Sequence, residues 1–100
     1  MKIKHNHATI YWRTDGEATS QVFYDTLSHD ILADYTNHTT ERKNLAKEHK
    51  VNLNKLSPFT TYYYRVRSTV GGAEFISAEY TFKTLTSPGG WKWWWASLFN

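Results

Sequence analysis

The 100-residue chain contains no cysteine, only two prolines, and no run of apolar residues long enough to cross a membrane as a helix. Because it has no cysteine, it can form neither a disulfide framework nor a thiolate site. A large excess of one charge is also missing, since 12 Lys and Arg against 9 Asp and Glu leave a net charge of +3. Nucleic-acid-binding domains usually carry a denser basic stripe, so we do not expect a nucleic acid as partner. A chain of this length is expected to form a single domain.

Aromatic residues are abundant, with 5 Trp, 7 Tyr and 5 Phe, and many of them alternate with polar residues. In residues 8–13, Ala8, Ile10 and Trp12 share one face, and this period of two indicates a half-buried strand. The same pattern predicts strands in residues 18–25, 47–53, 62–70 and 74–84. Residues 14–17 predict a turn, residues 71–72 a tight hairpin, and residues 31–35 give only a weak strand signal. No segment before residue 86 has a convincing helical period, so we predict an all-β sandwich.

The predicted core joins the apolar faces of these strands, and Tyr80 and Phe82 of the last strand are expected to point inward. Its members are Ile10, Trp12, Val22, Tyr24, Val51, Leu53, Leu56, Tyr62, Tyr64, Val66 and Phe82. Trp12 is expected to be structural, and its replacement by alanine is expected to cost roughly 3–5 kcal/mol.

Residues 56–66 read LSPFTTYYYRV, which resembles the L-x-P-x-T-x-Y-x-x-x-V segment before and along strand F of fibronectin type III domains. Residues 8–12 (ATIYW) resemble strand B of that family, and residues 79–84 (EYTFKT) resemble its closing strand G. Residues 18–24 (ATSQVFY) resemble strand C in its bacterial and archaeal branch, which includes the domain at the N-terminus of purple acid phosphatases. The resemblance covers roughly residues 8–84 in four ordered segments.

The resemblance implies an immunoglobulin-like antiparallel β-sandwich, which we expect in residues 1–86. A change of composition at residues 87–90 predicts that a hinge and a Trp-rich tail follow in residues 87–100. It also implies that Tyr62 is the tyrosine-corner residue, whose hydroxyl bonds the backbone a few residues upstream. Two features depart from the family pattern. Phe59 stands where the family usually has glycine, and strand A is either a stub in residues 2–5 or replaced by another segment. An uncovered edge strand invites pairing with another chain.

The sequence contains no recognisable nucleophile–base–orienter set, Gly-rich phosphate loop or pair of carboxylates. His29, His38 and His49 fall in polar stretches that we expect to be mobile. His5 and His7 could share a strand face, but zinc sites use three or four protein ligands. We therefore expect no catalytic residue, no metal and no cofactor, and we do not expect the chain to be an enzyme.

The outward faces of three predicted strands carry an aromatic and basic patch. Its residues are Gln21, Phe23, Tyr63, Arg65, Arg67 and Lys83. Such a patch could bind an acidic protein or a carbohydrate. It could equally be an ordinary exposed face, on which arginine stems cover aromatic rings.

Four of the five tryptophans fall in residues 91–95, after the sequence Pro-Gly-Gly at 88–90. A helix would align Trp91, Trp94 and Trp95 with residue 98 in one apolar stripe, whereas a strand would put residues 91, 93 and 95 on one face. Three surfaces for this tail stay open: a membrane, the strand-A edge of its own domain, or a second copy of the chain. The residues predicted to make the contact are Trp91, Trp93, Trp94, Trp95, Leu98 and Phe99.

The sequence thus favours a non-catalytic interaction or spacer module of a larger cell-surface or secreted protein, with a protein or carbohydrate partner. The alternative is a membrane-proximal or self-associating element that acts through its Trp-rich tail. The location is expected to be extracellular or at the cell surface, and a cytoplasmic location stays open because a domain without cysteine suits either compartment. Both functions are expectations from a fold-level resemblance.

Overall fold

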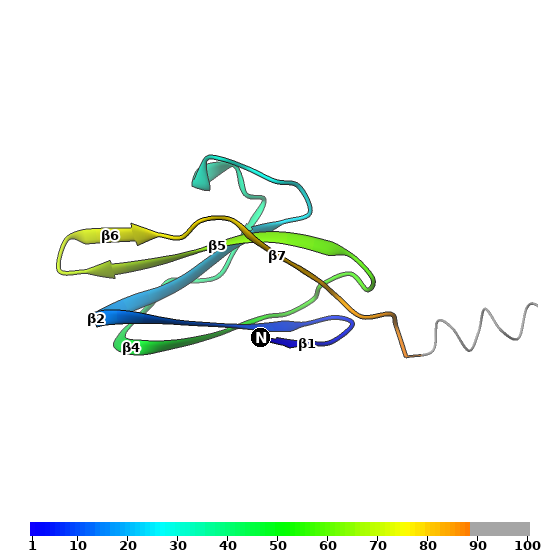
Figure 1. Cartoon of the computed structure of the whole chain (residues 1–100), viewed down its shortest axis with the longest axis horizontal. Helices are drawn as coiled ribbons and strands as arrows, with labels where there is room; N and C mark the ends of the chain where they lie inside the picture. The colour runs from blue at the N-terminus through cyan, green and yellow to red at the C-terminus, as the bar shows by residue number, and fades with distance from the viewer. Residues whose placement is uncertain (89–100) are drawn as a thin grey trace, which may run out of the picture.

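The computed structural model describes residues 1–88, which form seven strands and one short 3-10 turn (Figure 1). The strands are β1 (Lys2–Ile3), β2 (Ala8–Asp25), β3 (Asn37–His38), β4 (Arg42–Leu53), β5 (Thr61–Val70), β6 (Ala73–Ile76) and β7 (Tyr80–Lys83), and the 3-10 turn is η1 (Leu32–Asp34). All strand pairs are antiparallel. The predicted all-β fold is confirmed.

The strands lie in two layers that share β2 (Figure 1). In one layer the first half of β2 pairs with β4 along residues 8–13, and β1 pairs with its beginning at Ala8 and Thr9. In the other layer residues 21–25 of β2 pair with β5, and β3 pairs with the same part of β2. Both β6 and β7 pair with β5, β7 near its start and β6 near its end. This is the two-layer arrangement of an immunoglobulin-like sandwich.

The turn predicted in residues 14–17 is not a separate loop. These residues belong to β2, and the register against β4 shifts between Arg13 and Ala18 and again between Ala18 and Ser20. The ribbon bends at this point and passes from one layer to the other (Figure 1). Irregular pairing of this kind lets a strand bend without breaking, so the polar residues at 14–17 mark a corner within one strand.

The core lies between the layers and matches the predicted set closely. Its buried members are Ala8, Ile10, Val22, Val51, Leu53, Leu56, Tyr62, Tyr64 and Phe82, and Ile3, Trp12, Tyr24 and Val66 pack against them. Tyr80 faces inward as predicted, but it is 55% exposed although Phe82, two residues later, is buried. The ring of Tyr80 lies against that of Tyr64 at the edge of the second layer, with a centroid distance of 6.0 Å.

The tyrosine corner implied by the resemblance is present. The backbone N–H of Ser57 donates a hydrogen bond of 2.8 Å to the hydroxyl of Tyr62. Phe59 in the same turn has a φ of 50°, so it adopts the left-handed conformation that usually favours glycine. The Nζ atom of Lys83 lies 3.7 Å from the centroid of the Phe59 ring, a cation–π contact at this turn.

The tight hairpin turn predicted at residues 71–72 is present between β5 and β6. Val70 and Ala73 pair across Gly71 and Gly72, whose φ values are 53° and 116°. Two consecutive residues with positive φ are typical of the hairpin turns that match the twist of a β-sheet. By contrast, residues 31–35 do not form a strand, since η1 occupies most of this stretch and Tyr35 after it is buried.

Candidate functional site

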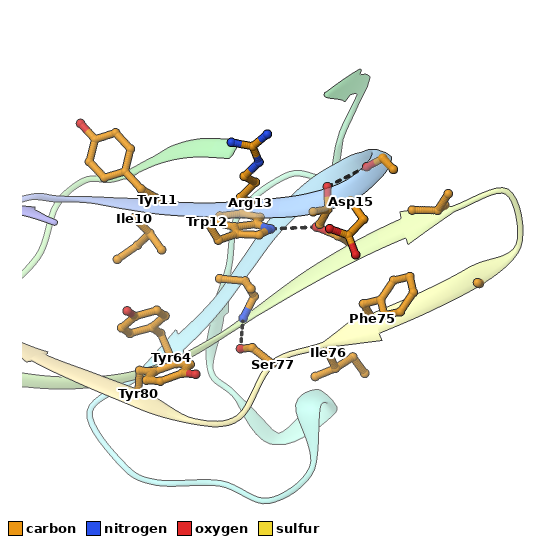
Figure 2. A pocket seen from close by; sticks show the side chains of 16 residues that line it. Ile10, Tyr11, Trp12, Arg13, Asp15, Tyr64, Phe75, Ile76, Ser77 and Tyr80 are labelled. Carbon is orange, nitrogen blue, oxygen red and sulfur yellow. Dashed lines mark hydrogen bonds between the residues drawn. The ribbon is translucent and has the colours of Figure 1, made fainter. Parts of the chain in front are cut away.

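A groove with a volume of about 590 Å³ opens between the two layers at one side of the sandwich. Figure 2 shows that Ile10 and Trp12 point from β2 towards Tyr64 on β5, whereas Tyr11 and Arg13 point away. Strand β6 supplies Phe75 to the other wall, whereas the side chain of Ile76 points to the opposite side of β6. The groove therefore lies over the edge of the core and is lined mainly by aliphatic and aromatic side chains.

The groove is open because β1 is short. Strand β1 pairs with β2 at two positions, Lys2 with Thr9 and Ile3 with Ala8. Beyond them, no strand of residues 1–88 pairs with residues 10–13 on the edge of β2 opposite β4. The expected stub of strand A is thus present at β1, and it leaves part of the β2 edge uncovered. An uncovered strand edge presents unpaired backbone N–H and C=O groups to any segment that can pair with them.

The mouth of the groove exposes large apolar side chains. Phe75, on the short edge strand β6, is 59% exposed. Tyr80 lines the same groove. Contiguous exposed apolar side chains around a concave surface are typical of a binding site, since single scattered ones are common on any protein. Sequence alternation did not reveal this site, because it indicates which residues share a face and not which edge lacks a cover.

Trp12 forms the floor of the groove through three contacts. Its indole Nε1 donates a hydrogen bond of 2.8 Å to Oγ of the buried Ser68 on β5. Its ring stacks on His49 of β4 with a centroid distance of 4.8 Å and an interplanar angle of 10°. It also packs against the core cluster. Trp12 therefore links both layers, as expected for a structural residue.

His49 is a buried histidine and not the mobile one predicted from the sequence. It is 2% exposed, and its ring nitrogens contact the hydroxyls of Ser20 at 2.5 Å and Thr14 at 2.9 Å. The Thr14 hydroxyl also donates to the carbonyl oxygen of Gly16 at 2.8 Å, so its oxygen is available to accept from the imidazole N–H. Ser20 and His49 resemble a nucleophile–base pair, but both are buried, and their hydrogen bonds serve the corner of β2.

Burial lowers the pKa of His49, and we expect this to make the fold sensitive to mild acid. A histidine whose pKa is lowered on folding contributes its full stability above the unfolded pKa of about 6.5 and loses it as the pH falls below that value. The free energy of unfolding should therefore fall between pH 7 and pH 5, by no more than about 1.4 kcal/mol per pH unit from this group. Urea unfolding at each pH measures it. The variant His49→Gln should flatten the profile relative to its own value at pH 7, whereas a His38→Gln control, at an exposed position, should not.

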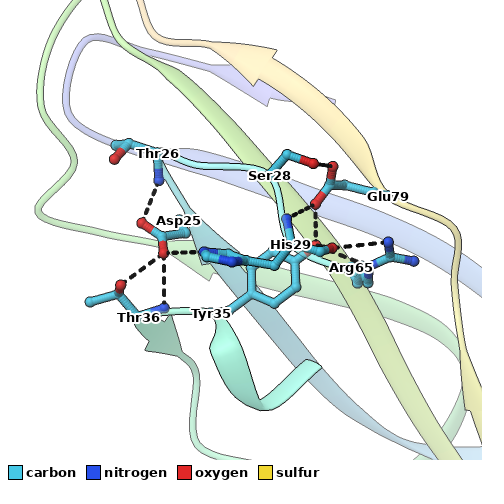
Figure 3. A network of polar contacts seen from close by, with 8 residues as sticks. All are labelled: Asp25, Thr26, Ser28, His29, Tyr35, Thr36, Arg65 and Glu79. Atoms are coloured by element: carbon cyan, nitrogen blue, oxygen red, sulfur yellow. Dashed lines mark hydrogen bonds and ion pairs between the residues drawn. The ribbon is translucent and has the colours of Figure 1, made fainter. Parts of the chain in front are cut away.

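A second polar cluster fixes the loop between β2 and β3 to the second layer (Figure 3). Asp25 accepts hydrogen bonds from the backbone N–H of Thr26 at 2.7 Å, from His29 Nε2 at 2.8 Å, and from Thr36 through its hydroxyl at 2.8 Å and its backbone N–H at 3.2 Å. Burial acts to raise the pKa of Asp25, but these hydrogen bonds outweigh it and hold the pKa well below its usual range. The ionised carboxylate of Asp25 thus holds the loop in place through these hydrogen bonds.

Glu79 forms the other half of the cluster. Its carboxylate accepts hydrogen bonds from the hydroxyls of Ser28 and Tyr35 and, at 3.0 Å, from the backbone N–H of His29. These contacts lower the pKa of Glu79 to about 2. Arg65 of β5 completes the cluster, with Nε donating to the Tyr35 hydroxyl at 3.0 Å and NH2 donating to the carbonyl oxygen of His29 at 3.1 Å. The charged groups are therefore engaged in holding the loop.

This loop alters the aromatic and basic patch predicted on the outward face. Phe23 is a correction, because it is only 9% exposed: the ring of His38 on β3 lies 5.5 Å from it, and the Arg67 guanidinium lies 5.2 Å from its centroid. Gln21, which bonds Arg67, is also buried. Arg65 is occupied in the cluster around Glu79. Tyr63 is half-buried and Lys83 is exposed, and binding by any of these residues stays a prediction.

The other predicted sites have different outcomes. His5 and His7 are partly buried, and His7 Nδ1 contacts the Asn6 side chain at 2.9 Å. Within residues 1–88, no group of three or more His, Asp or Glu side chains is placed to hold a metal ion. Membrane-crossing helices are likewise missing from this part of the chain, where the helical segment η1 has three residues. The predicted tail contacts, Trp91, Trp93, Trp94, Trp95, Leu98 and Phe99, lie outside the described residues.

Comparison with known proteins supports the resemblance seen in the sequence. The family model of the purple acid phosphatase N-terminal domain matches residues 2–84, which include every strand described above. Comparisons with curated proteins and with solved structures gave no match. Because the family match covers most of the chain and the strands form the corresponding sandwich, the chain belongs to the purple acid phosphatase N-terminal domain family.

Proposed function

We propose that this domain is a non-catalytic interaction or spacer module of a larger cell-surface or secreted protein. The family supports the modular part of this proposal, since its name describes one domain of a longer enzyme. The cell-surface or secreted setting rests on the fold-level resemblance to fibronectin type III modules. The observation that carries the interaction role is the open groove, whose walls expose Phe75 and Tyr80 beside an uncovered strand edge.

The distribution of polar groups also supports binding over catalysis. The side chains with the strongest polar contacts, Asp25, Glu79 and Arg65, hold the loop between β2 and β3 and do not line the groove. The groove itself gathers aromatic and aliphatic groups, which contribute affinity by leaving water. A partner with an apolar segment would fit this surface.

The groove can be tested with the apolar dye anilinonaphthalene sulfonate. We expect a full-length chain in which the four tail tryptophans are replaced by serine to bind the dye, with enhanced fluorescence. The substitution Phe75→Glu should abolish this binding because Phe75 faces Ser68 across the β5–β6 pair on the groove side, so the change places a charge at the groove mouth. Leu45→Glu is the matched control, since Leu45 is similarly exposed at 58% and does not line the groove. Equal dye binding by both variants would contradict the groove as the interaction surface.

The non-catalytic part has its own test. We expect no turnover of a chromogenic phosphate monoester by the purified chain, with or without added divalent metal salts. Sustained turnover that follows the protein through a sizing column would overturn this part of the proposal, and the groove result would stand independently.

A second function is favoured by the composition of the tail. Tryptophan is enriched at membrane interfaces, and residues 91–95 hold four of them, so the chain could act as a membrane-proximal or self-associating element. Co-sedimentation with phosphatidylcholine–phosphatidylserine vesicles tests the membrane version. Tail-dependent sedimentation, lost when the four tryptophans are replaced by serine, would favour it, and equal sedimentation of both chains would exclude it.

A further inference from the structure

We infer that the C-terminal segment, residues 91–99, docks into the groove of its own molecule and covers the open edge of β2. The inference rests on the proposed function, because it takes the groove as the interaction surface and names its occupant. It makes the groove a docking site for a segment of the same chain.

The route begins at the point where the chain leaves the sandwich. After β7, the backbone N–H of Leu85 donates to the carbonyl oxygen of Lys4 at 3.2 Å, and the carbonyl oxygen of Leu85 accepts from the N–H of Phe59 at 2.9 Å. Lys4 lies in the turn between β1 and β2, where its N–H donates to the carbonyl oxygen of His7 at 2.8 Å. The chain therefore leaves beside the end of β1, on the edge of the layer that β1 only partly covers (Figure 1).

The length of the remaining chain suits this route. From His7, beside the exit, to Gly16 at the far end of the groove, β2 would span roughly 30 Å along a straight strand. Residues 89–100 would reach roughly 40 Å when extended. The sequence Pro-Gly-Gly at 88–90 supplies the residue types that reverse a chain direction, and a reversal is needed because the groove runs back along β2.

The chemistry of the segment matches that of the groove. Tryptophan has a large apolar surface and a single N–H donor, so it loses little on leaving water when that donor is satisfied. The groove offers exposed Phe75 and Tyr80 for packing and, along the edge of β2 that no strand of residues 1–88 covers, backbone groups for hydrogen bonds. Addition of an extended segment to an open sheet edge is a common mode of peptide recognition. The groove can therefore offer the tail both apolar contacts and backbone hydrogen bonds without any rearrangement of the core.

Because the tail is covalently joined to the domain, docking in its own groove is favoured over docking in the groove of a second copy. A segment joined by a short linker has an effective concentration in the millimolar range at its site, provided that the linker reaches. A second copy at micromolar concentration would compete poorly with it. We therefore commit to docking within one molecule, and exchange between molecules becomes an outcome that the experiment can reveal.

Photo-crosslinking tests the inference directly on the full chain. A photoreactive benzoylphenylalanine introduced at Phe75, which is exposed and at the groove mouth, should crosslink to the peptide containing residues 93–100 within a chain of monomeric mass. The same group at Leu45 should not crosslink to that peptide. Crosslinks found only in a dimeric species would overturn docking within one molecule, and loss of all tail crosslinks at position 75 would overturn docking in the groove.

Dye displacement separates failure of this inference from failure of the proposed function. If the groove binds apolar groups and the tail occupies it, anilinonaphthalene sulfonate should bind the tail variant but not the native chain. Equal binding to both chains, still abolished by Phe75→Glu, would keep the groove as a binding surface and overturn the tail as its occupant. Binding unaffected by Phe75→Glu would contradict the proposed function itself.

Discussion

Replacing Trp12 by alanine is expected to lower the free energy of unfolding by roughly 3–5 kcal/mol, the range found for large aromatic residues truncated in a core. The substitution removes the packing of the indole against the core and its stack on His49. It also leaves the buried hydroxyl of Ser68 without the indole N–H. Urea unfolding followed by far-ultraviolet circular dichroism measures the loss.

The variant Trp12→Phe separates packing from hydrogen bonding. Phenylalanine keeps an aromatic ring over His49 but has no N–H to donate to Ser68, so we expect a loss of about 1–2 kcal/mol. If Trp12→Ala cost less than about 1 kcal/mol, an ordinary surface effect, Trp12 would not link the two layers as described.

Replacing Asp25 by alanine is the second large expected effect, with a loss of about 3 kcal/mol at pH 7. The reason is that Asp25 is buried and accepts four hydrogen bonds, so its removal leaves Thr26, His29 and Thr36 without their acceptor. The loop between β2 and β3 should then open first, as fast amide exchange in residues 26–36. Asp34→Ala is the control, since Asp34 is exposed in the same loop and its loss should stay within about 0.5 kcal/mol.

The same prediction has a pH dependence of known sign. A carboxyl whose pKa is lowered on folding contributes its full stability above the unfolded pKa, about 3.9 for aspartate, and loses it as the pH falls through the folded value. The difference between the native chain and Asp25→Ala should therefore be constant from neutral pH down to about pH 4–5 and shrink below that. A difference that instead grew in acid would contradict the role of the ionised carboxylate.

The core could be predicted from the sequence because it depends on a local regularity. Alternation in residues 8–13 and 62–70 placed Ile10, Tyr62 and Tyr64 inward, and the structure buries all three. The family resemblance added the tyrosine corner at Tyr62, which depends on one hydrogen bond over five residues. Tyr80 also points inward as predicted, but it stays exposed because β7 pairs at the edge of the layer, where an inward-pointing side chain need not be covered.

The polar cluster could not be predicted, because it depends on contacts between residues far apart in sequence. The pairs Ser28–Glu79 and Tyr35–Glu79 span 51 and 44 residues, and neither forms a pattern of period two. Consequently the loop after β2 was expected to be a polar stretch, and Phe23 beneath β3 was expected to be exposed. The groove could not be predicted either, because it forms where β1 ends after pairing with two residues of β2. The sequence did indicate an uncovered strand edge and a Trp-rich tail that needs an apolar surface to pack against. We propose that the tail covers this edge.

If the open side of the sandwich is the surface on which this domain binds and the tail is its occupant, as we propose, amide hydrogen exchange along β2 measures that occupancy directly. The native chain is compared with the full-length variant in which the four tail tryptophans are serine. We expect amides at the open edge in residues 10–13 to exchange at least about tenfold more slowly in the native chain, which corresponds to about 1.4 kcal/mol of docking free energy. Amides of β4 that pair with β2 serve as the internal reference and should be unchanged. Equal exchange at the open edge in both chains would contradict the docking of the tail.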